Sequence, residues 1–299
     1  MELDPAAVRT PVPAPGRLPD FLIIGAMKSG TTTLRLYLDE HPQARCVKET
    51  HFFNVNYERG AGWYASLFAD DGKHPALVGE KCPAYLSRPQ ATKRMAELLP
   101  AARLVVLLRD PVERAYSHYW HARREGWERL SFRRAIAAED RRLAANPTGE
   151  RRNYVHQSRY LPQLEHVCSL YPRDALLVML FEDLRDDPAG TFARTCRFLG
   201  IDDSVAPPHP GTARNSFSRH RPEWLWRTMN RRRLWRFLPE RVAFRLGRMM
   251  ETDKGYPPMD PTMRKRIIER LAPDTLALAD WLGRDLHEWK SAREMSAAR

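Results

Sequence analysis

Short runs of hydrophobic residues alternate along the chain with segments in which hydrophobic residues recur every three or four positions. The runs lie at 21–25, 76–79, 103–108 and 175–181, and each is continuous and followed by a polar turn. Continuous runs of this length are typical of strands buried on both faces of a parallel sheet. The first run leads into a helical pattern over 31–42, so the folded part begins as strand, loop and helix.

The remaining helical patterns alternate with these strands. We place further helices after Arg88, Pro111, Ser131, Ser158, Pro188 and Pro261. Strands that alternate with helices favour an α/β fold in three layers, with a central, mostly parallel sheet flanked by helices. No internal repeat is visible.

The domain boundaries follow from where the periodicity starts and stops. Residues 1–19 are rich in proline and lack periodicity, which predicts a disordered tail. A single domain is expected over 20–290, followed by a short tail at 291–299. A chain of 299 residues is long enough for one large core.

The composition gives expectations about location and metal sites. No apolar run approaches the roughly 18 residues needed to span a membrane, and the first residues lack an export signal. The four cysteines lie far apart, without the spacing of metal ligands. We therefore expect a cytoplasmic protein with reduced thiols and no bound metal.

The chain carries 49 basic and 37 acidic residues, a formal net charge of +12. This balance favours an anionic partner, such as a phosphate, a nucleic acid or an acidic glycan, without choosing among them. Ten arginines and Trp224, Trp226 and Trp235 gather within 219–248. We expect a helical insertion there, either a lid over an anionic acceptor, a peripheral membrane contact, or simply a solvated basic face.

A glycine-rich loop lies between the first strand and the first helix. Its sequence, GAMKSGTTT over 25–33, stands where backbone N–H groups and the helix dipole bind phosphate. A nucleotide triphosphatase loop requires lysine directly after the second glycine, but Thr31 stands there and the lysine is Lys28, inside the loop. A sulfuryl group carries less charge than a γ-phosphate and transfers without metal, so this P-loop-like pattern favours sulfuryl transfer.

A second anion-binding pattern follows the strand at 103–108. Arg109 stands at the carboxyl end of that strand, Asp110 can cap the next helix, and Ser117 comes two helical turns later. A guanidinium group and a hydroxyl suit a phosphate.

These motifs resemble those of the sulfotransferases that use 3′-phosphoadenosine 5′-phosphosulfate (PAPS). PDFLIIGAMKSGTTTL is similar to their 5′-phosphosulfate loop, and RLVVLLRDPVERAYSHY to their 3′-phosphate motif. KETHFF at 48–53 and GEKCPAYL at 79–86 resemble the branch with the heparan sulfate N- and 3-O-sulfotransferases and their bacterial relatives. DKGYPPMDP at 253–261 resembles the loop that closes over the nucleotide.

The resemblance implies a set of roles. Glu49 would be the base that takes the acceptor proton, with His51 beside it, and Lys28 and Lys81 would lie near the sulfuryl group. The cofactor would contact Lys28, Ser29, Gly30, Thr31, Thr32, Thr33, Arg109, Ser117, Lys254, Gly255 and Tyr256. The cofactor would be PAPS, with adenosine 3′,5′-bisphosphate as product and no metal required.

Simpler interpretations compete with several of these roles. Local ion pairs would join Arg109 to Asp110 or Glu113, Glu49 to Lys48, and Lys81 to Glu80. Ser117 would then be a packing residue and Arg114 a supporting one. Met27, Asn54 and Tyr256 depart from residues frequent in the glycan enzymes, so a heparan-like specificity does not follow.

The interpretation that fits best is transfer of the sulfuryl group from PAPS to a hydroxyl or amine of a glycan, glycolipid or hydroxylated natural product. The alternatives are a P-loop-type kinase or nucleotide triphosphatase and a non-enzymatic anion-binding protein. The chain lacks a nucleic-acid-binding signature, so nucleic acid is not the expected partner. The oligomeric state leaves no trace in the sequence.

Overall fold

The structure, a computed structural model, describes residues 16–69, 75–146, 150–207, 218–220, 242, 251–254 and 256–297. The strands of its main sheet are β1 Phe21–Gly25, β2 Ala44–Lys48, β3 Leu77–Lys81, β4 Arg103–Leu108 and β5 Leu176–Leu180. All four predicted strands are present within one or two residues. The edge strand β2 was not predicted.

The helices are α1 Thr31–Asp39, α2 Gly60–Ser66, α3 Pro89–Leu98, α4 Pro111–Arg124, α5 Phe132–Ala137, α6 Glu139–Ala145, α7 Leu161–Cys168, α8 Phe181–Asp186, α9 Pro188–Leu199, α12 Pro261–Leu282 and α13 Lys290–Ala297. Every helix predicted outside 219–248 is found. The unpredicted ones, α2, α6, α8 and α13, have eight residues or fewer, too short to show a clear period.

The five strands of the main sheet run in the order β2-β3-β1-β4-β5, and every neighbouring pair is parallel. This confirms the predicted α/β fold with a parallel central sheet. The chain passes from β1 to β2 and β3 on one side of β1 and then crosses to β4 and β5 on the other side, so the order reverses at β1. Ligands of such sheets bind beside the carboxyl ends of the strands at this reversal.

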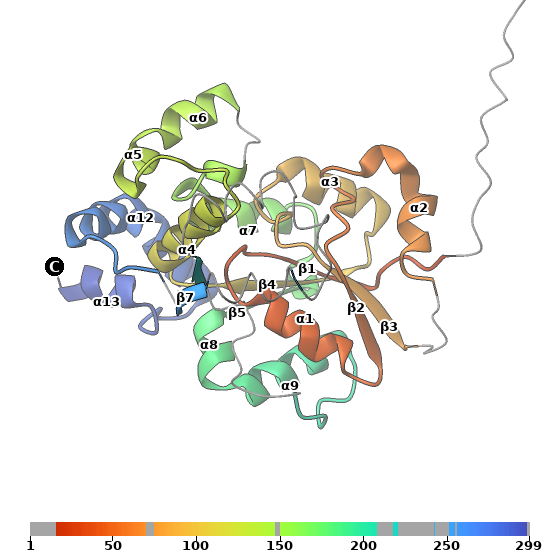
Figure 1. The fold of residues 1–299 in the computed structure, drawn as a ribbon. Helices are drawn as coiled ribbons and strands as arrows, with labels where there is room; N and C mark the ends of the chain where they lie inside the picture. The colour runs from red at the N-terminus through yellow and green to blue at the C-terminus, as the bar shows by residue number, and fades with distance from the viewer. Residues whose placement is uncertain are drawn as a thin grey trace, which may run out of the picture.

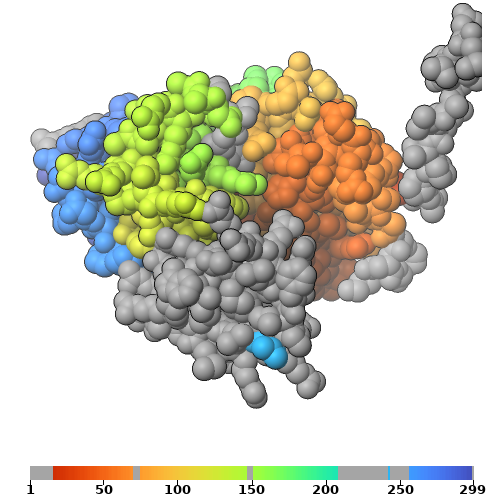
Figure 2. Space-filling model, turned by 45° about the horizontal axis from the view of Figure 1, so that its top comes forward, coloured from red at the N-terminus to blue at the C-terminus, as the bar shows by residue number. Residues whose placement is uncertain are grey.

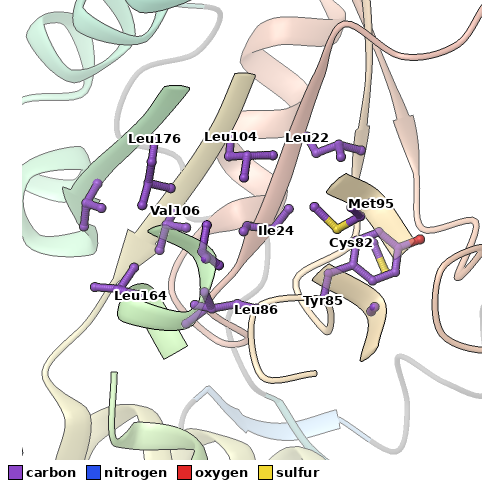
Figure 3. Packing of buried hydrophobic residues seen from close by; sticks show 14 of the residues in the cluster. Leu22, Ile24, Cys82, Tyr85, Leu86, Met95, Leu104, Val106, Leu164 and Leu176 are labelled. Atoms are coloured by element: carbon purple, nitrogen blue, oxygen red, sulfur yellow. The ribbon is translucent and has the colours of Figure 1, made fainter. Parts of the chain in front are cut away.

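Alternating side chains of the sheet feed two hydrophobic cores, one on each face. Leu22 and Ile24 pack with α3 and α7 on one face, and Phe21 and Ile23 pack with α1, α8 and α9 on the other. Figure 1 shows these helices on opposite sides of the strands, and Figure 3 shows the first core, with Leu104 and Val106 of β4 in it. The three layers hold the strand ends fixed.

The C-terminal residues fasten the sheet edge at which β4 and β5 end. The indole of Trp289 donates a hydrogen bond to Glu182 at 3.0 Å, and the backbone N–H of Ser291 donates to Asp110 at 2.8 Å. Since α13 continues to Ala297 and Ser291 is buried, helical structure extends through the first seven residues of the expected tail at 291–299. The domain also starts before residue 20, because Arg17 binds the carbonyl of Ala76.

Two further strands, β6 Ser218–His220 and β7 Glu251–Lys254, pair with each other in antiparallel fashion. Most of 219–248, the predicted arginine- and tryptophan-rich insertion, lies outside the described residues, as does the tail up to residue 15. Among the helices that the structure describes, none is long and apolar enough to cross a membrane. Within the same ranges, no three His, Cys, Asp or Glu side chains gather where they could hold a metal ion.

Candidate functional site

The glycine-rich loop joins β1 to α1 at the reversal point of the sheet. Gly30 caps α1 with φ of 82°, a left-handed conformation that suits glycine, and a Cβ there would lie 2.8 Å from the ring of Phe181. No side chain caps the first turn of α1, and the Thr33 N–H donates to the Gly30 carbonyl at 2.9 Å. The N–H groups of Thr31 and Thr32 are left for a ligand. The buried hydroxyl of Ser29 also has no hydrogen-bond partner among the described residues.

Lys28 stands in this loop with φ of 75°, a conformation that costs a non-glycine residue energy. Burial, followed by repulsion from Arg124 and Arg109, lowers the pKa of Lys28 to about 8. The described residues give Lys28 no ion-pair partner, so its charge is held in place without neutralisation. This is a surrounding that attracts an anion.

Arg109 follows β4 and lies beside the loop. Its guanidinium donates to the carbonyl of Lys28 at 3.3 Å and lies 5.0 Å from the ring centre of Phe181. Among the described residues, neither ion pair considered for Arg109 is found. Asp110 caps α4 by accepting from the N–H groups of Val112 and Glu113, and the Glu113 carboxylate pairs with Arg264. Arg109 and Lys28 therefore present two cations at one edge of the sheet.

Ser117 and Arg114 lie on α4 and differ in role. Ser117 is buried two turns into the helix, as predicted from the sequence. Arg114 points into the protein, where it donates to the Ser158 hydroxyl at 2.8 Å and to the carbonyl of Tyr154. Arg114 thus holds the 154–158 segment against α4 and is no phosphate ligand.

Glu49, His51 and Lys81 meet at the ends of β2 and β3. The two strands pair Lys48 with Lys81, so Glu49 follows directly beside the end of β3. The amine of Lys81 forms an ion pair with one carboxylate oxygen of Glu49, and the Nε2 atom of His51 lies 3.4 Å from the other. The Lys81 amine also lies 3.5 Å from the Thr32 hydroxyl, which links this cluster to the glycine-rich loop.

These contacts decide the charge of Glu49. Burial raises the pKa of the Glu49 carboxyl, but the hydrogen bonds and charges of His51 and Lys81 outweigh it and lower that pKa to about 2. Glu49 is therefore a carboxylate at neutral pH. A carboxylate can accept a proton once its cationic partner moves away.

His51 reaches Glu49 by a different path from the one expected. The prediction placed both residues on one face of an extended segment, but His51 has φ of 54° and turns the chain after β2. Its Nδ1 atom lies 3.5 Å from the Cys82 thiol, and its Nε2 atom faces Glu49. Glu49 and His51 do lie side by side, as predicted, but the extended conformation from which this was predicted is wrong.

The ion pairs considered between sequence neighbours, Glu49 with Lys48 and Lys81 with Glu80, are replaced by contacts between residues farther apart in the sequence. Glu49 pairs with Lys81 and His51. Glu80 does not pair with Lys81, because consecutive side chains of a strand point to opposite faces. Glu80 instead accepts hydrogen bonds from Thr50, Tyr64 and Tyr85 on the other side of β3.

Three residues at the end of α4 belong to the same region, although the sequence analysis did not select them. Arg124 lowers and Glu125 raises the pKa of Lys28, and the charges of Lys28 and Glu49 both act on the pKa of His121. Burial, with Lys28 and Arg124, lowers the pKa of His121 to about 3. They lie four, seven and eight residues after Ser117, which places them on the same face of α4. This spacing could have predicted that they lie near the site.

The C-terminal cofactor contacts expected at 254–256 are described only in part. Lys254 ends β7, and Gly255 lies outside the described residues. Tyr256 packs edge-on against Tyr116 of α4 at 5.2 Å. The Tyr116 hydroxyl donates to the carbonyl of Pro257 at 2.9 Å, so this segment lies against the helix that begins after Arg109.

Replacing Lys81 by methionine should return the pKa of Glu49 toward its usual value. A carboxyl with a pKa lowered in the folded state stabilises the protein above about pH 4.5, and this contribution disappears as pH falls toward 2. We expect urea unfolding at pH 6 and pH 3 to show a smaller loss of stability in Lys81→Met than in the wild type. Equal losses would mean that Lys81 does not set the charge of Glu49.

Comparisons with known proteins match this arrangement. A profile of the sulfotransferase domain matches residues 18–224. Human heparan sulfate glucosamine 3-O-sulfotransferase 6 is 33% identical over 205 residues, 66% of this chain and 56% of that protein. Human bifunctional heparan sulfate N-deacetylase/N-sulfotransferase 3 is 30% identical over 288 residues, 91% of this chain and 31% of that protein. The chain thus spans about half of one curated relative and a third of the other.

A solved structure agrees with the sequence matches. The sulfotransferase from Alicyclobacillus acidocaldarius superimposes with a TM-score of 0.69 at 27% identity, over 92% of this chain and 99% of that one. Together, the domain profile and this common fold establish that the chain belongs to the sulfotransferase family.

Proposed function

We propose that the protein transfers the sulfuryl group of PAPS to a hydroxyl, or to an amine, of an acceptor. One observation carries the proposal: the Lys81 amine lies between the Glu49 carboxylate and the Thr32 hydroxyl of the glycine-rich loop. The Lys81 side chain therefore contacts both the proposed base for the acceptor and the proposed site for the donor phosphate. In-line transfer requires this adjacency.

The residues present fit the phosphates of PAPS. The uncapped first turn of α1 and the unpartnered Ser29 hydroxyl offer donors, and Lys28 supplies positive charge for the 5′ phosphosulfate. Thr31, Thr32 and Thr33 follow in the same turn. Arg109 and the buried Ser117 would hold the 3′-phosphate, with the Tyr256 segment packed beside α4.

When bound, PAPS supplies an activated sulfuryl group. Lys28 holds positive charge where negative charge grows on the departing phosphate, which favours the transition state over the ground state. His51 and Lys81 together hold the pKa of Glu49 low in the free protein. As Lys81 turns toward the sulfuryl oxygens, the carboxylate loses its cation, its proton affinity rises, and it takes the acceptor proton.

A glycan is the acceptor class that we favour, because the two human relatives described above are named for heparan sulfate. Figure 2 shows the surface formed by α4, α5 and α6 meeting that of the first 70 residues along a seam. Arg124 at the end of α4 lies near enough to Lys28 to lower the pKa of its amine. An acidic chain placed there would meet the positive charges of Arg124 and Lys28.

Transfer of radiolabelled sulfate from PAPS tests the proposal. The purified protein would be incubated with a glucuronic acid–glucosamine polymer carrying free amines and with the same polymer carrying N-sulfates. We expect at least one of the two polymers to be labelled without added Mg²⁺. In the control variant Lys28→Ala, labelling should fall by about 10²-fold or more. Labelling from γ-labelled ATP instead would favour the kinase alternative.

A further inference from the structure

Glu80 is fully buried in the middle of the sheet, next to Lys81 in sequence but facing the opposite side of β3. A buried carboxylate is costly unless hydrogen bonds satisfy it. Burial raises the pKa of Glu80, and its hydrogen bonds from Tyr64 and Thr50 oppose that change. No step of the proposed transfer uses this carboxylate, so its presence needs another explanation.

The donors to Glu80 come from the segment after β2 and from two buried tyrosines. Thr50 donates twice, through its backbone N–H at 2.8 Å and its hydroxyl at 2.7 Å. The hydroxyls of Tyr64 and Tyr85 donate at 2.7 Å and 3.1 Å, and Figure 3 shows Tyr85 within the first core. Glu80 therefore joins Thr50 to rigid, buried parts of the protein.

Thr50 is the residue between Glu49 and His51. Its carbonyl accepts from the Asn56 side chain at 2.7 Å, and its hydroxyl also accepts from the Phe52 N–H at 3.1 Å. Phe52 stacks on the Tyr64 ring at 4.3 Å. With both backbone groups of Thr50 fixed, the chain leaves β2 in one direction only, and its neighbours on either side face Lys81 and Cys82.

We propose that Glu80 is a positioning residue, which by binding Thr50 holds Glu49 and His51 in the geometry needed for proton transfer. This inference rests on the proposed function of Glu49. Lys81 and Glu80 then act on the base from opposite faces of β3. Lys81 lowers the pKa of Glu49 through an ion pair, and Glu80 fixes the position of Glu49 by binding Thr50. Displacement of a reacting group by about an ångström lowers rates up to about a hundredfold.

Two substitutions provide a matched test, because each removes one hydroxyl donor from the same carboxylate. Thr50→Val removes the donor attached to the segment that carries Glu49, and Tyr64→Phe removes the donor attached to α2. Both should lower the melting temperature. Only Thr50→Val should lower the transfer rate, by about tenfold or more, with unchanged affinity for adenosine 3′,5′-bisphosphate, and Thr50→Ser should restore the rate.

Amide hydrogen exchange of the peptide covering 48–56 gives a second readout that needs no acceptor. Uptake of deuterium should rise in Thr50→Val and stay near the wild-type level in Tyr64→Phe. Equal loss of rate in both variants, or unchanged rate and exchange in Thr50→Val, would overturn the proposal. If the wild type transfers no sulfate, the proposed function fails, and the exchange comparison alone decides whether Glu80 anchors the segment.

Discussion

Glu49→Gln should lower the rate of sulfate transfer by roughly 10²- to 10⁴-fold, the usual contribution of a general base. Glutamine keeps the size of the side chain and can still accept from Lys81, but it cannot take a proton. Because the phosphate-binding loop and Arg109 are unaltered, the affinity for adenosine 3′,5′-bisphosphate should stay within about threefold of the wild type. Calorimetry and initial rates with labelled PAPS measure the two quantities.

Glu125→Gln is the matched control for charge. Glu125 is a partly buried carboxylate that acts on Lys28, and it pairs with Arg124 at the end of α4. Glu125→Gln removes one negative charge, as Glu49→Gln does, without altering the carboxylate beside Lys81. A similar fall in rate for both variants would mean that Glu49 acts through charge and is not the base.

Lys28→Ala should lower the transfer rate per bound PAPS by about 10²- to 10³-fold, since a fixed donor at a developing charge has this effect in other enzymes. Affinity should fall as well, because the same cation meets the phosphate before the reaction. Lys28→Arg keeps the charge but not the compact ammonium group, so it should recover affinity more than rate.

The lowered pKa of Lys28 gives this prediction a dependence on pH. With a pKa of about 8 in the free protein, much of Lys28 is neutral at pH 9, and an anionic phosphate favours the protonated form. Binding of adenosine 3′,5′-bisphosphate at pH 9 should therefore take up nearly one proton, and Lys28→Arg should take up none. Calorimetry in two buffers of different ionisation enthalpy counts the protons; equal uptake would exclude Lys28 from the phosphate site.

The part of the site that the sequence predicted depends on local patterns. A strand, a glycine-rich turn and a helix placed Lys28 and Gly30, and a strand followed by a capped helix placed Arg109, because each pattern is complete within a few residues. The strand β2 was missed because Arg45 and Lys48, on an edge strand, interrupt the hydrophobic run. Without it, the ion pair of Glu49 with Lys81 could not be predicted.

Other contacts join residues that no local pattern connects. Ser291 reaches Asp110 across 181 positions, and Trp289 reaches Glu182 across 107. The partners of Glu80 depend on α2, whose seven residues contain two glycines and show no helical period. By contrast, consecutive residues of a strand face opposite sides. The sequence alone could therefore have excluded an ion pair between Glu80 and Lys81.

We expect the glycine-rich loop to bind a 3′,5′-bisphosphate nucleotide in place of a triphosphate with Mg²⁺. Calorimetric titration of the purified protein with adenosine 3′,5′-bisphosphate, and separately with ATP and Mg²⁺, tests it most directly, for the wild type and for Arg109→Ala. We predict tight binding of the bisphosphate without metal, weakened by about a hundredfold in Arg109→Ala. Preference for ATP with Mg²⁺, or no loss of affinity in the variant, would contradict the account.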